Sequence, residues 1–194
     1  MENHEKVTVE TIRKQCWDEA LYAYGTAYIF EQRAQRFSKL LKRLTFLGLV
    51  VPAAIGSIVL SFGVQTSYLP IFLTIGGVLG TIQLAGSLWA LTSKWEEGFG
   101  YSMESSSSNY RLANRFERLA QLPPENLSKL KIQFDLIRVE NELRSEQDNK
   151  QGITDKEKRM GMRASLRKYQ RQCATCNLVP KSMTATTCYT CGNF

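Results

Sequence analysis

The fold is decided by residues 44–93, which read LTFLGLVVPAAIGSIVLSFGVQTSYLPIFLTIGGVLGTIQLAGSLWALTS and contain no Asp, Glu, Lys, Arg or His. This run holds two apolar segments, 44–64 and 68–93, and each is longer than the roughly 20 residues that an α-helix needs to cross a bilayer core. A buried helical hairpin in a soluble protein would carry a polar stripe on its outward face. We therefore expect two transmembrane helices, joined by a turn at Gln65-Thr66-Ser67.

The positive residues around this run predict its orientation. They stand on both outer flanks of the hairpin, whereas the turn has none; they are Arg33, Arg36, Lys39, Lys42, Arg43, Lys94, Arg111, Arg115 and Arg118. The positive-inside rule places such flanks in the cytoplasm, so both termini are expected there. A cleaved signal peptide fits poorly, because the apolar region begins after residue 43 and is doubled.

The remaining sequence is helical in pattern. Apolar residues recur at three- and four-residue intervals over 8–43, and no proline separates this segment from the first span. A second helix is expected over 94–122, with a weak centre at the serine run 105–108, and a third over 125–150 with Leu127, Leu130, Phe134, Ile137 and Leu143 on its apolar face. A last helix opens at a capping box, Thr154 with Glu157, and continues toward Gln172.

These patterns predict an all-α membrane protein with four regions. They are a cytosolic N-terminal helix (1–43), a two-transmembrane hairpin (44–93), a cytosolic helical region (94–172) and a small C-terminal zinc ribbon (173–194).

The ribbon is predicted from four cysteines near the C-terminus. Cys173 and Cys176 form one Cys-x-x-Cys pair, Cys188 and Cys191 form a second, and eleven residues separate the pairs. Four thiolates at this spacing can hold a tetrahedral zinc ion with no open position for catalysis, so the ion would be structural. Disulfides are the alternative, and a reducing cytosol argues against them. The fifth cysteine, Cys16, lies on the pattern of a packed helix.

The last helix is strongly basic. Its positive residues outnumber the two acids Asp155 and Glu157, and they are Lys156, Lys158, Arg159, Arg163, Arg167, Lys168 and Arg171. Such a helix can be a solvated face, or can rest on anionic lipid headgroups. The second interpretation is a docking surface for phosphate groups of a ligand.

Within the second span, Gly76, Gly80, Gln83 and Ser87 form one stripe of small and polar residues. Small residues four apart let helix backbones approach closely, and an amide in hydrocarbon needs a partner or water. We expect this stripe, and Gln83 in particular, to face a subunit interface or a pore. The absence of ionisable residues from either span argues against proton-coupled transport.

The architecture resembles the SLATT family of prokaryotic two-transmembrane effectors. The ending SLRKYQRQCATCNLVPKSMTATTCYTCGNF (165–194) resembles the mobilome CxxCx(11)CxxC subgroup, with the four cysteines at the motif positions and Pro180 and Gly192 around them. The resemblance covers essentially the whole chain, and the cysteine spacing is its specific part.

The resemblance implies a pore-forming effector of antiphage defence in the prokaryotic inner membrane. Such effectors are often encoded beside a nucleotidyltransferase, whose nucleotide or single-stranded DNA product acts as the signal. In Hailong-type pairs a DNA oligomer holds the channel shut. The implied protein is an ion channel and a homo-oligomer, for which we expect a tetramer.

A non-conducting membrane anchor, whose zinc ribbon recruits a protein or a nucleic acid, is the alternative function. An enzyme is not expected, because the sequence contains no Ser-His-Asp or Cys-His constellation and no phosphate-binding loop.

Overall fold

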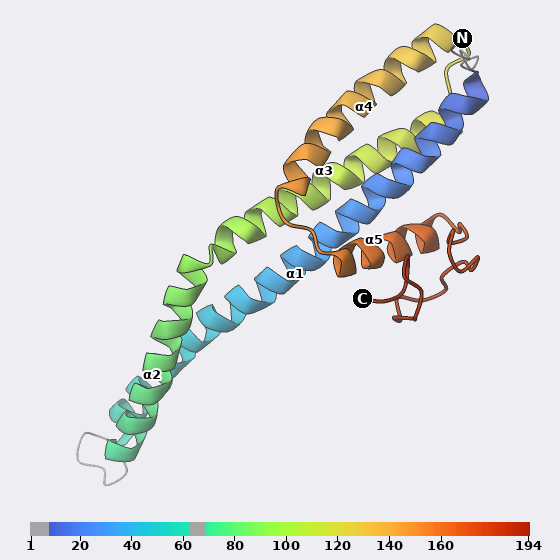
Figure 1. The fold of residues 1–194 in the computed structure, drawn as a ribbon. Helices are drawn as coiled ribbons and strands as arrows, with labels where there is room; N and C mark the ends of the chain where they lie inside the picture. The colour runs from blue at the N-terminus through green and yellow to red at the C-terminus, as the bar shows by residue number, and fades with distance from the viewer. Residues whose placement is uncertain (1–7, 63–68) are drawn as a thin grey trace. The chain divides into compact units, whose positions relative to one another are not determined.

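The structure is a computed structural model that describes residues 8–62 and 69–194. The predicted turn at residues 65–67 and the histidine at position 4 lie outside these described residues. Five helices form the described chain: α1 (Val9–Phe62), α2 (Leu69–Thr92), α3 (Trp95–Gln121), α4 (Leu127–Asn149) and α5 (Asp155–Lys168) (Figure 1). The expectation that the N-terminal helix continues into the first apolar segment is confirmed, because α1 is one helix of 54 residues.

The chain divides into two compact units, which we call the bundle unit (residues 1–32 and 102–194) and the hairpin unit (residues 33–101). Helices α1 and α3 each contribute residues to both units. Helices α4 and α5 and the C-terminal tail belong to the bundle unit, whereas α2 belongs to the hairpin unit.

The core of the bundle unit is formed where α1, α3 and α4 pack side by side (Figure 1). The apolar positions that the sequence predicts for the first part of α1 are buried, and those from Ile12 to Ala23 contact apolar side chains of the other two helices. The core consists of Ile12, Cys16, Ala20, Ala23, Leu112, Ala113, Phe116, Leu119, Ala120, Leu130, Phe134 and Ile137. Burial of this face, at about 25 cal/mol per Å² of apolar surface, stabilises the three helices together.

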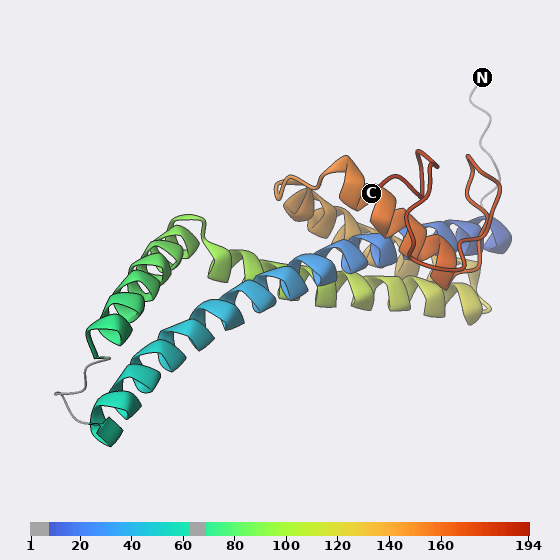
Figure 2. The ribbon, with the colours of Figure 1, turned by 90° about the horizontal axis from the view of Figure 1, so that it is seen from below.

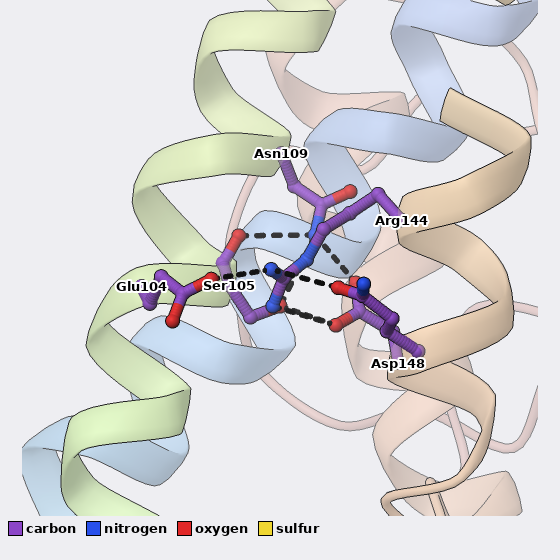
Figure 3. A network of polar contacts seen from close by, with 6 residues as sticks. Glu104, Ser105, Asn109, Arg144 and Asp148 are labelled. Carbon is purple, nitrogen blue, oxygen red and sulfur yellow. Dashed lines mark hydrogen bonds and ion pairs between the residues drawn. The ribbon is translucent and has the colours of Figure 1, made fainter. Parts of the chain in front are cut away.

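A buried polar network joins α3 to α4 beyond this core (Figure 3). The Asp148 carboxylate accepts hydrogen bonds from Ser105 Oγ and Asn109 Nδ2, both at 2.7 Å, and pairs with Arg144 Nη2 at 3.1 Å. Arg144 Nη1 also donates to Glu104 Oε1 at 2.9 Å. Removing one member would leave a buried charge or donor without a partner. Because α4 can make all these contacts with α3 only in one rotation about its axis, the network fixes that rotation.

The same network corrects two sequence-based expectations. The serine run does not weaken α3, which is a continuous helix through it, because Ser105 is fully buried and bonded to Asp148. Leu143 does not belong to the inner face of α4: its side chain is 58% exposed, and the buried positions after Ile137 are the polar Arg144 and Asp148.

Helix α5 begins at the predicted capping box and ends earlier than predicted. Thr154 Oγ1 accepts from the Glu157 N–H, and the Glu157 carboxylate accepts from the Thr154 N–H. At the other end, Gln170 adopts φ +51° and the Arg171 N–H donates to the Leu166 carbonyl, which is the pattern of a Schellman C-cap. This cap turns the chain away from the helix axis just before the cysteine motif.

Helix α5 crosses α1 at two glycines (Figures 1 and 2). A Cβ on Gly161 would lie 2.7 Å from the Gly25 carbonyl oxygen and 2.9 Å from Ile29. A Cβ on Gly25 would lie 2.7 Å from Ser165 Oγ. The two backbones therefore approach more closely than any larger residue would allow, and this crossing seats α5 on the bundle.

In the hairpin unit, α1 and α2 pack through small residues. A Cβ on Gly76 would meet Ile55, one on Gly48 would meet the Gln83 amide, and one on Gly86 would contact Leu44. Pro52 lies inside α1 without ending it.

Most of the hairpin surface is apolar and exposed. Both helices are long and apolar enough to cross a membrane, and their most apolar stretches are not buried within the chain. The large exposed side chains of α2 are Ile71, Phe72, Leu73, Ile75, Val78, Leu79, Ile82, Leu84, Leu88, Trp89 and Leu91.

Candidate metal centre

The four motif cysteines converge at the end of the chain. Their sulfur atoms all lie within 4.8 Å of one another. Cys173 Sγ lies 3.9 Å from Cys188 Sγ, and Cys176 Sγ lies 3.8 Å from Cys191 Sγ. A tetrahedral ion with Zn–S bonds of about 2.3 Å separates its sulfur ligands by about 3.8 Å. These distances fit a four-thiolate metal site, and all five cysteines of the chain are free of disulfides.

Each Cys-x-x-Cys pair sits on a turn of the same design. The Asn177 N–H donates to the Cys173 carbonyl at 2.8 Å, and the Gly192 N–H donates to the Cys188 carbonyl at 2.9 Å. Asn177 adopts φ +55°, a conformation that asparagine tolerates better than most residues. The two turns contact each other at equivalent positions, because the hydroxyls of Thr175 and Thr190 are hydrogen-bonded.

Gly192 is required by close packing in the second turn. A Cβ at this position would lie 2.0 Å from Thr186 Oγ1, 2.8 Å from the Thr186 carbonyl oxygen and 2.9 Å from the Cys188 backbone nitrogen. Two of these atoms belong to the backbone and cannot move aside without opening the turn.

Electrostatics favour a cation among the thiolates. Backbone N–H groups of Cys191 and Thr190 lower the pKa of Cys188 to about 6. Burial, together with the neighbouring sulfur atoms, raises the pKa of Cys191. Four thiolates can be charged side by side only with a cation between them.

The predicted ribbon is not confirmed. No strand is found in residues 8–62 and 69–194, and the tail consists of turns and irregular segments. The cysteines are instead packed on helices: Cys173 and Cys191 are buried against Leu21 of α1 and Leu166 of α5. The tail therefore depends on the bundle unit for its position, in addition to any ion that it holds.

A family profile that describes the mobilome CxxCx(11)CxxC proteins matches residues 13–194. The chain belongs to the mobilome CxxCx(11)CxxC family. Searches of curated proteins and of solved structures each found no match.

In this mobilome CxxCx(11)CxxC protein, the seven basic residues of the last helix do not share one exposed face. The middle of α5 is covered on several sides by α1 and by the tail, and its buried residues are Gly161, Arg163, Ala164, Ser165 and Leu166. Lys156, Lys158, Arg167 and Lys168 are exposed at the two ends of the helix.

The other three basic residues are used in contacts within the protein. Arg163 is 6% exposed and donates to the carbonyls of Ser182, at 2.7 Å, and Cys191, at 3.1 Å. Arg159 Nε donates to the Asn193 carbonyl, and Arg171 pairs with Asp18 of α1. Arg163 thus positions the metal loop, a role that its place in a run of basic residues did not indicate.

The predicted stripe of α2 is split between two environments. Gly76 is buried against α1, and Gln83 of α2 lies against Gly48 of α1. Gly80 is exposed, and a Cβ there would meet no described residue within 4 Å. Gln83 and Ser87 line a groove of the hairpin unit together with Thr45.

Cys16 takes no part in the centre. It is fully buried in the bundle core, and burial raises its pKa to about 11. This placement agrees with the prediction of a packed residue.

Proposed function

We propose that this protein is a membrane effector of prokaryotic antiphage defence, of the SLATT type. Its hairpin unit crosses the inner membrane with both termini in the cytoplasm, and several copies assemble into an ion-conducting pore. A nucleotide or single-stranded DNA signal, made by a nucleotidyltransferase encoded nearby, binds the cytosolic bundle unit and biases the pore between open and closed. The observation that carries the proposal is the exposed, uncharged surface of the hairpin together with the polar groove inside it.

The exposed surface supports insertion into lipid. Large apolar side chains cover the outside of α2, and Phe46, Leu47, Leu49, Val50 and Leu60 do the same for α1. Large contiguous apolar surfaces are rare on soluble monomers, and they mark contact with a membrane or a partner. Helical structure satisfies the backbone hydrogen bonds that lipid could not.

The groove supports conduction over anchoring alone. Thr45, Gln83 and Ser87 line this groove together with apolar residues and with Lys94, Glu96 and Glu97. An amide in hydrocarbon needs water or a hydrogen-bonding partner. Two helices cannot enclose a water path, so conduction requires several copies with these groups turned inward.

The four-cysteine centre is proposed to hold zinc as a structural ion. Cys173, Cys176, Cys188 and Cys191 fill a tetrahedral shell with thiolates, which leaves no open coordination position. The ion would hold the tail in place against Arg163 of α5. Nothing in this arrangement supports an enzymatic role, and we propose a binding and conducting protein.

The flux experiment uses full-length protein in liposomes loaded with a potassium-sensitive dye. Gln83→Leu removes the amide from the groove. We expect the ion flux to change at least about ten-fold, which corresponds to a change of about 1.4 kcal/mol in the barrier. Thr81→Val is the matched control. Its hydroxyl donates to the Gly77 carbonyl of its own helix, and its side chain is exposed outside the groove.

Equal flux through Gln83→Leu and the unaltered protein would refute the assignment of Gln83 to the pore. An anchor would give no flux for any variant, with or without a nucleotide. That result would favour the alternative function, recruitment of a protein or nucleic acid to the membrane.

The signal is proposed to bind at exposed basic residues of α5. Arg167→Glu with Lys168→Glu is expected to weaken binding of a fluorescent single-stranded DNA oligomer by about 100-fold at low salt, since each phosphate contact contributes through counterion release. Lys131→Glu on α4 with Lys150→Glu at its C-cap changes the net charge equally and is the control. Binding that both double variants weaken equally would argue against a site on α5.

A further inference from the structure

Helix α1 carries a second groove in the hairpin unit, where its basic segment meets its uncharged segment. Six residues of α1, between Ser38 and Leu49, and Phe99 of α3 line this groove, and none of them is acidic. Its volume is about 520 Å³, which lies in the range of ligand sites. We call it the α1 groove. It shares Leu41, Thr45 and Leu49 with the groove that Gln83 lines, so the two grooves lie on neighbouring sides of α1.

The lining of the α1 groove changes from polar to apolar along the helix. Ser38 and Lys42 stand before the uncharged segment, and Phe46 and Leu49 stand inside it. These four residues recur at intervals of four, four and three, so they follow one face of α1. At 1.5 Å per residue, Lys42 and Leu49 are about 10 Å apart along the helix axis. The groove therefore has a cationic end and an apolar end.

The basic segment of α1 carries positive charge that the described chain does not neutralise. Four of its basic residues are exposed: Arg36, Lys39, Lys42 and Arg43. Residues 33–43 contain no Asp or Glu. None of the four forms a salt bridge with another residue of 8–62 or 69–194, whereas Lys94, at the other flank, pairs with Glu97 at 3.0 Å. The charge at the head of the α1 groove is therefore available to an anionic partner.

A phospholipid matches both ends of the groove. The phosphate of an anionic headgroup can pair with the Lys42 ammonium and accept a hydrogen bond from the Ser38 hydroxyl, while an acyl chain lies against Phe46 and Leu49. Anionic lipids attract basic residues that stand immediately on the cytoplasmic side of a span. A nucleic acid would satisfy the cations alone, because its charged backbone does not enter hydrocarbon.

We infer that the α1 groove binds one anionic phospholipid of the cytoplasmic leaflet, with its phosphate at Lys42 and Ser38 and an acyl chain along Phe46 and Leu49. The inference rests on the proposed insertion of the hairpin unit into a membrane. It goes beyond that proposal, because ordinary contact with lipid requires no preference for a headgroup. It does not depend on conduction, so a failed flux experiment would leave it intact.

The test measures lipid preference at the groove itself. Full-length protein carries Phe46→Trp as a fluorescent reporter, with Trp89→Phe and Trp95→Phe in the same chain, and is reconstituted into phosphatidylcholine vesicles. A fixed fraction of the lipid is brominated phosphatidylglycerol or brominated phosphatidylcholine, and bromine quenches a tryptophan that the acyl chain touches. Phosphatidylglycerol should show an affinity at least about five-fold higher, since one basic residue close to an anionic surface contributes about that factor.

A second reporter controls for ordinary lipid contact. Leu60→Trp, in the same background, places the tryptophan near the far end of the first span, where Leu60 is 89% exposed. The two brominated lipids should quench this reporter equally. Phe46 and Trp89 are also exposed, so replacing them by other aromatic residues should not disturb folding. Trp17 packs against the bundle core and adds a constant signal.

Two neighbouring charges separate the groove from general attraction to an anionic surface. Lys42 lines the α1 groove, whereas Arg43 stands about 100° around the helix and does not line it. Lys42→Gln should lower the preference for phosphatidylglycerol at the Phe46→Trp reporter by about five-fold, and Arg43→Gln by less than about two-fold. Each variant removes one positive charge from an exposed side chain at nearly the same depth, so the difference between them reports the groove.

Two results would overturn the inference and leave membrane insertion in place. Equal quenching of the Phe46→Trp reporter by both brominated lipids would show that the groove does not select a headgroup. Equal losses from Lys42→Gln and Arg43→Gln would show that the basic segment attracts anionic lipid without a defined site. Quenching of neither reporter by either lipid would contradict insertion of the hairpin unit, and the inference with it.

Discussion

Cys191→Ser is expected to abolish metal binding and to release the C-terminal tail from the bundle unit. The purified protein should fall from about one equivalent of metal to less than about a tenth, because a structural zinc site draws about 10–16 kcal/mol from a complete ligand set. Cys191 is buried and touches Leu21 and Leu166, so loss of the ion also loosens an apolar contact. Metal analysis by mass spectrometry and limited proteolysis of residues 173–194 measure the two effects.

Cys16→Ala is the matched control for this experiment. Cys16 lies in the bundle core and outside the four-cysteine cluster, so this variant should retain a full equivalent of metal. Metal retained by Cys191→Ser, or a tail equally resistant to protease with and without metal, would contradict the assigned role of the centre.

Gly161→Ala is expected to destabilise the bundle unit by about 1–3 kcal/mol, the cost of forcing an extra methyl group into a packed site. The new Cβ would lie 2.7 Å from the Gly25 carbonyl oxygen, a backbone atom, so α5 would have to move off α1. This cost exceeds the gain of up to about 1 kcal/mol that alanine brings to a helix interior. Thermal unfolding followed by Trp17 fluorescence measures the change, because Trp17 contacts Tyr169 at the end of α5.

Gly100→Ala is the control for helix propensity. Gly100 lies inside α3, and a Cβ there would meet no described residue within 4 Å. This variant should be as stable as the unaltered protein or more so. A Gly161→Ala protein that unfolds at the same temperature as Gly100→Ala would show that the helix crossing is not close-packed.

Several features of the fold were predictable because each rests on a local rule. The periodic apolar residues in the first part of α1 are buried as expected, and α3 and α4 are separate helices as predicted. The Thr154–Glu157 capping box forms where the sequence places it. The cysteine spacing alone predicted a four-thiolate cluster, because two Cys-x-x-Cys turns can meet in only a few ways.

Other features depended on partners distant in sequence. Ser105 looked like a weak point in a helix, and it is buried because Asp148, on another helix, accepts its hydrogen bond. Arg163 looked like one of seven solvated charges, and two carbonyls of the folded-back tail accept its hydrogen bonds. Leu143 matched the apolar period of α4, yet the inner face there is polar. Periodicity assigns residues to faces, but it does not say which face is buried.

The sequence by itself determined the helical segments, the uncharged hairpin and the identity of the four thiolates, because composition, spacing and caps act over a few neighbouring residues. Only the tertiary structure decided which glycines permit the crossing of α1 and α5, which arginine positions the metal loop, and which side of α4 remains exposed. Those outcomes depend on which surfaces meet when the helices pack, and residues more than a hundred positions apart, such as Gly25 and Gly161, determine them together.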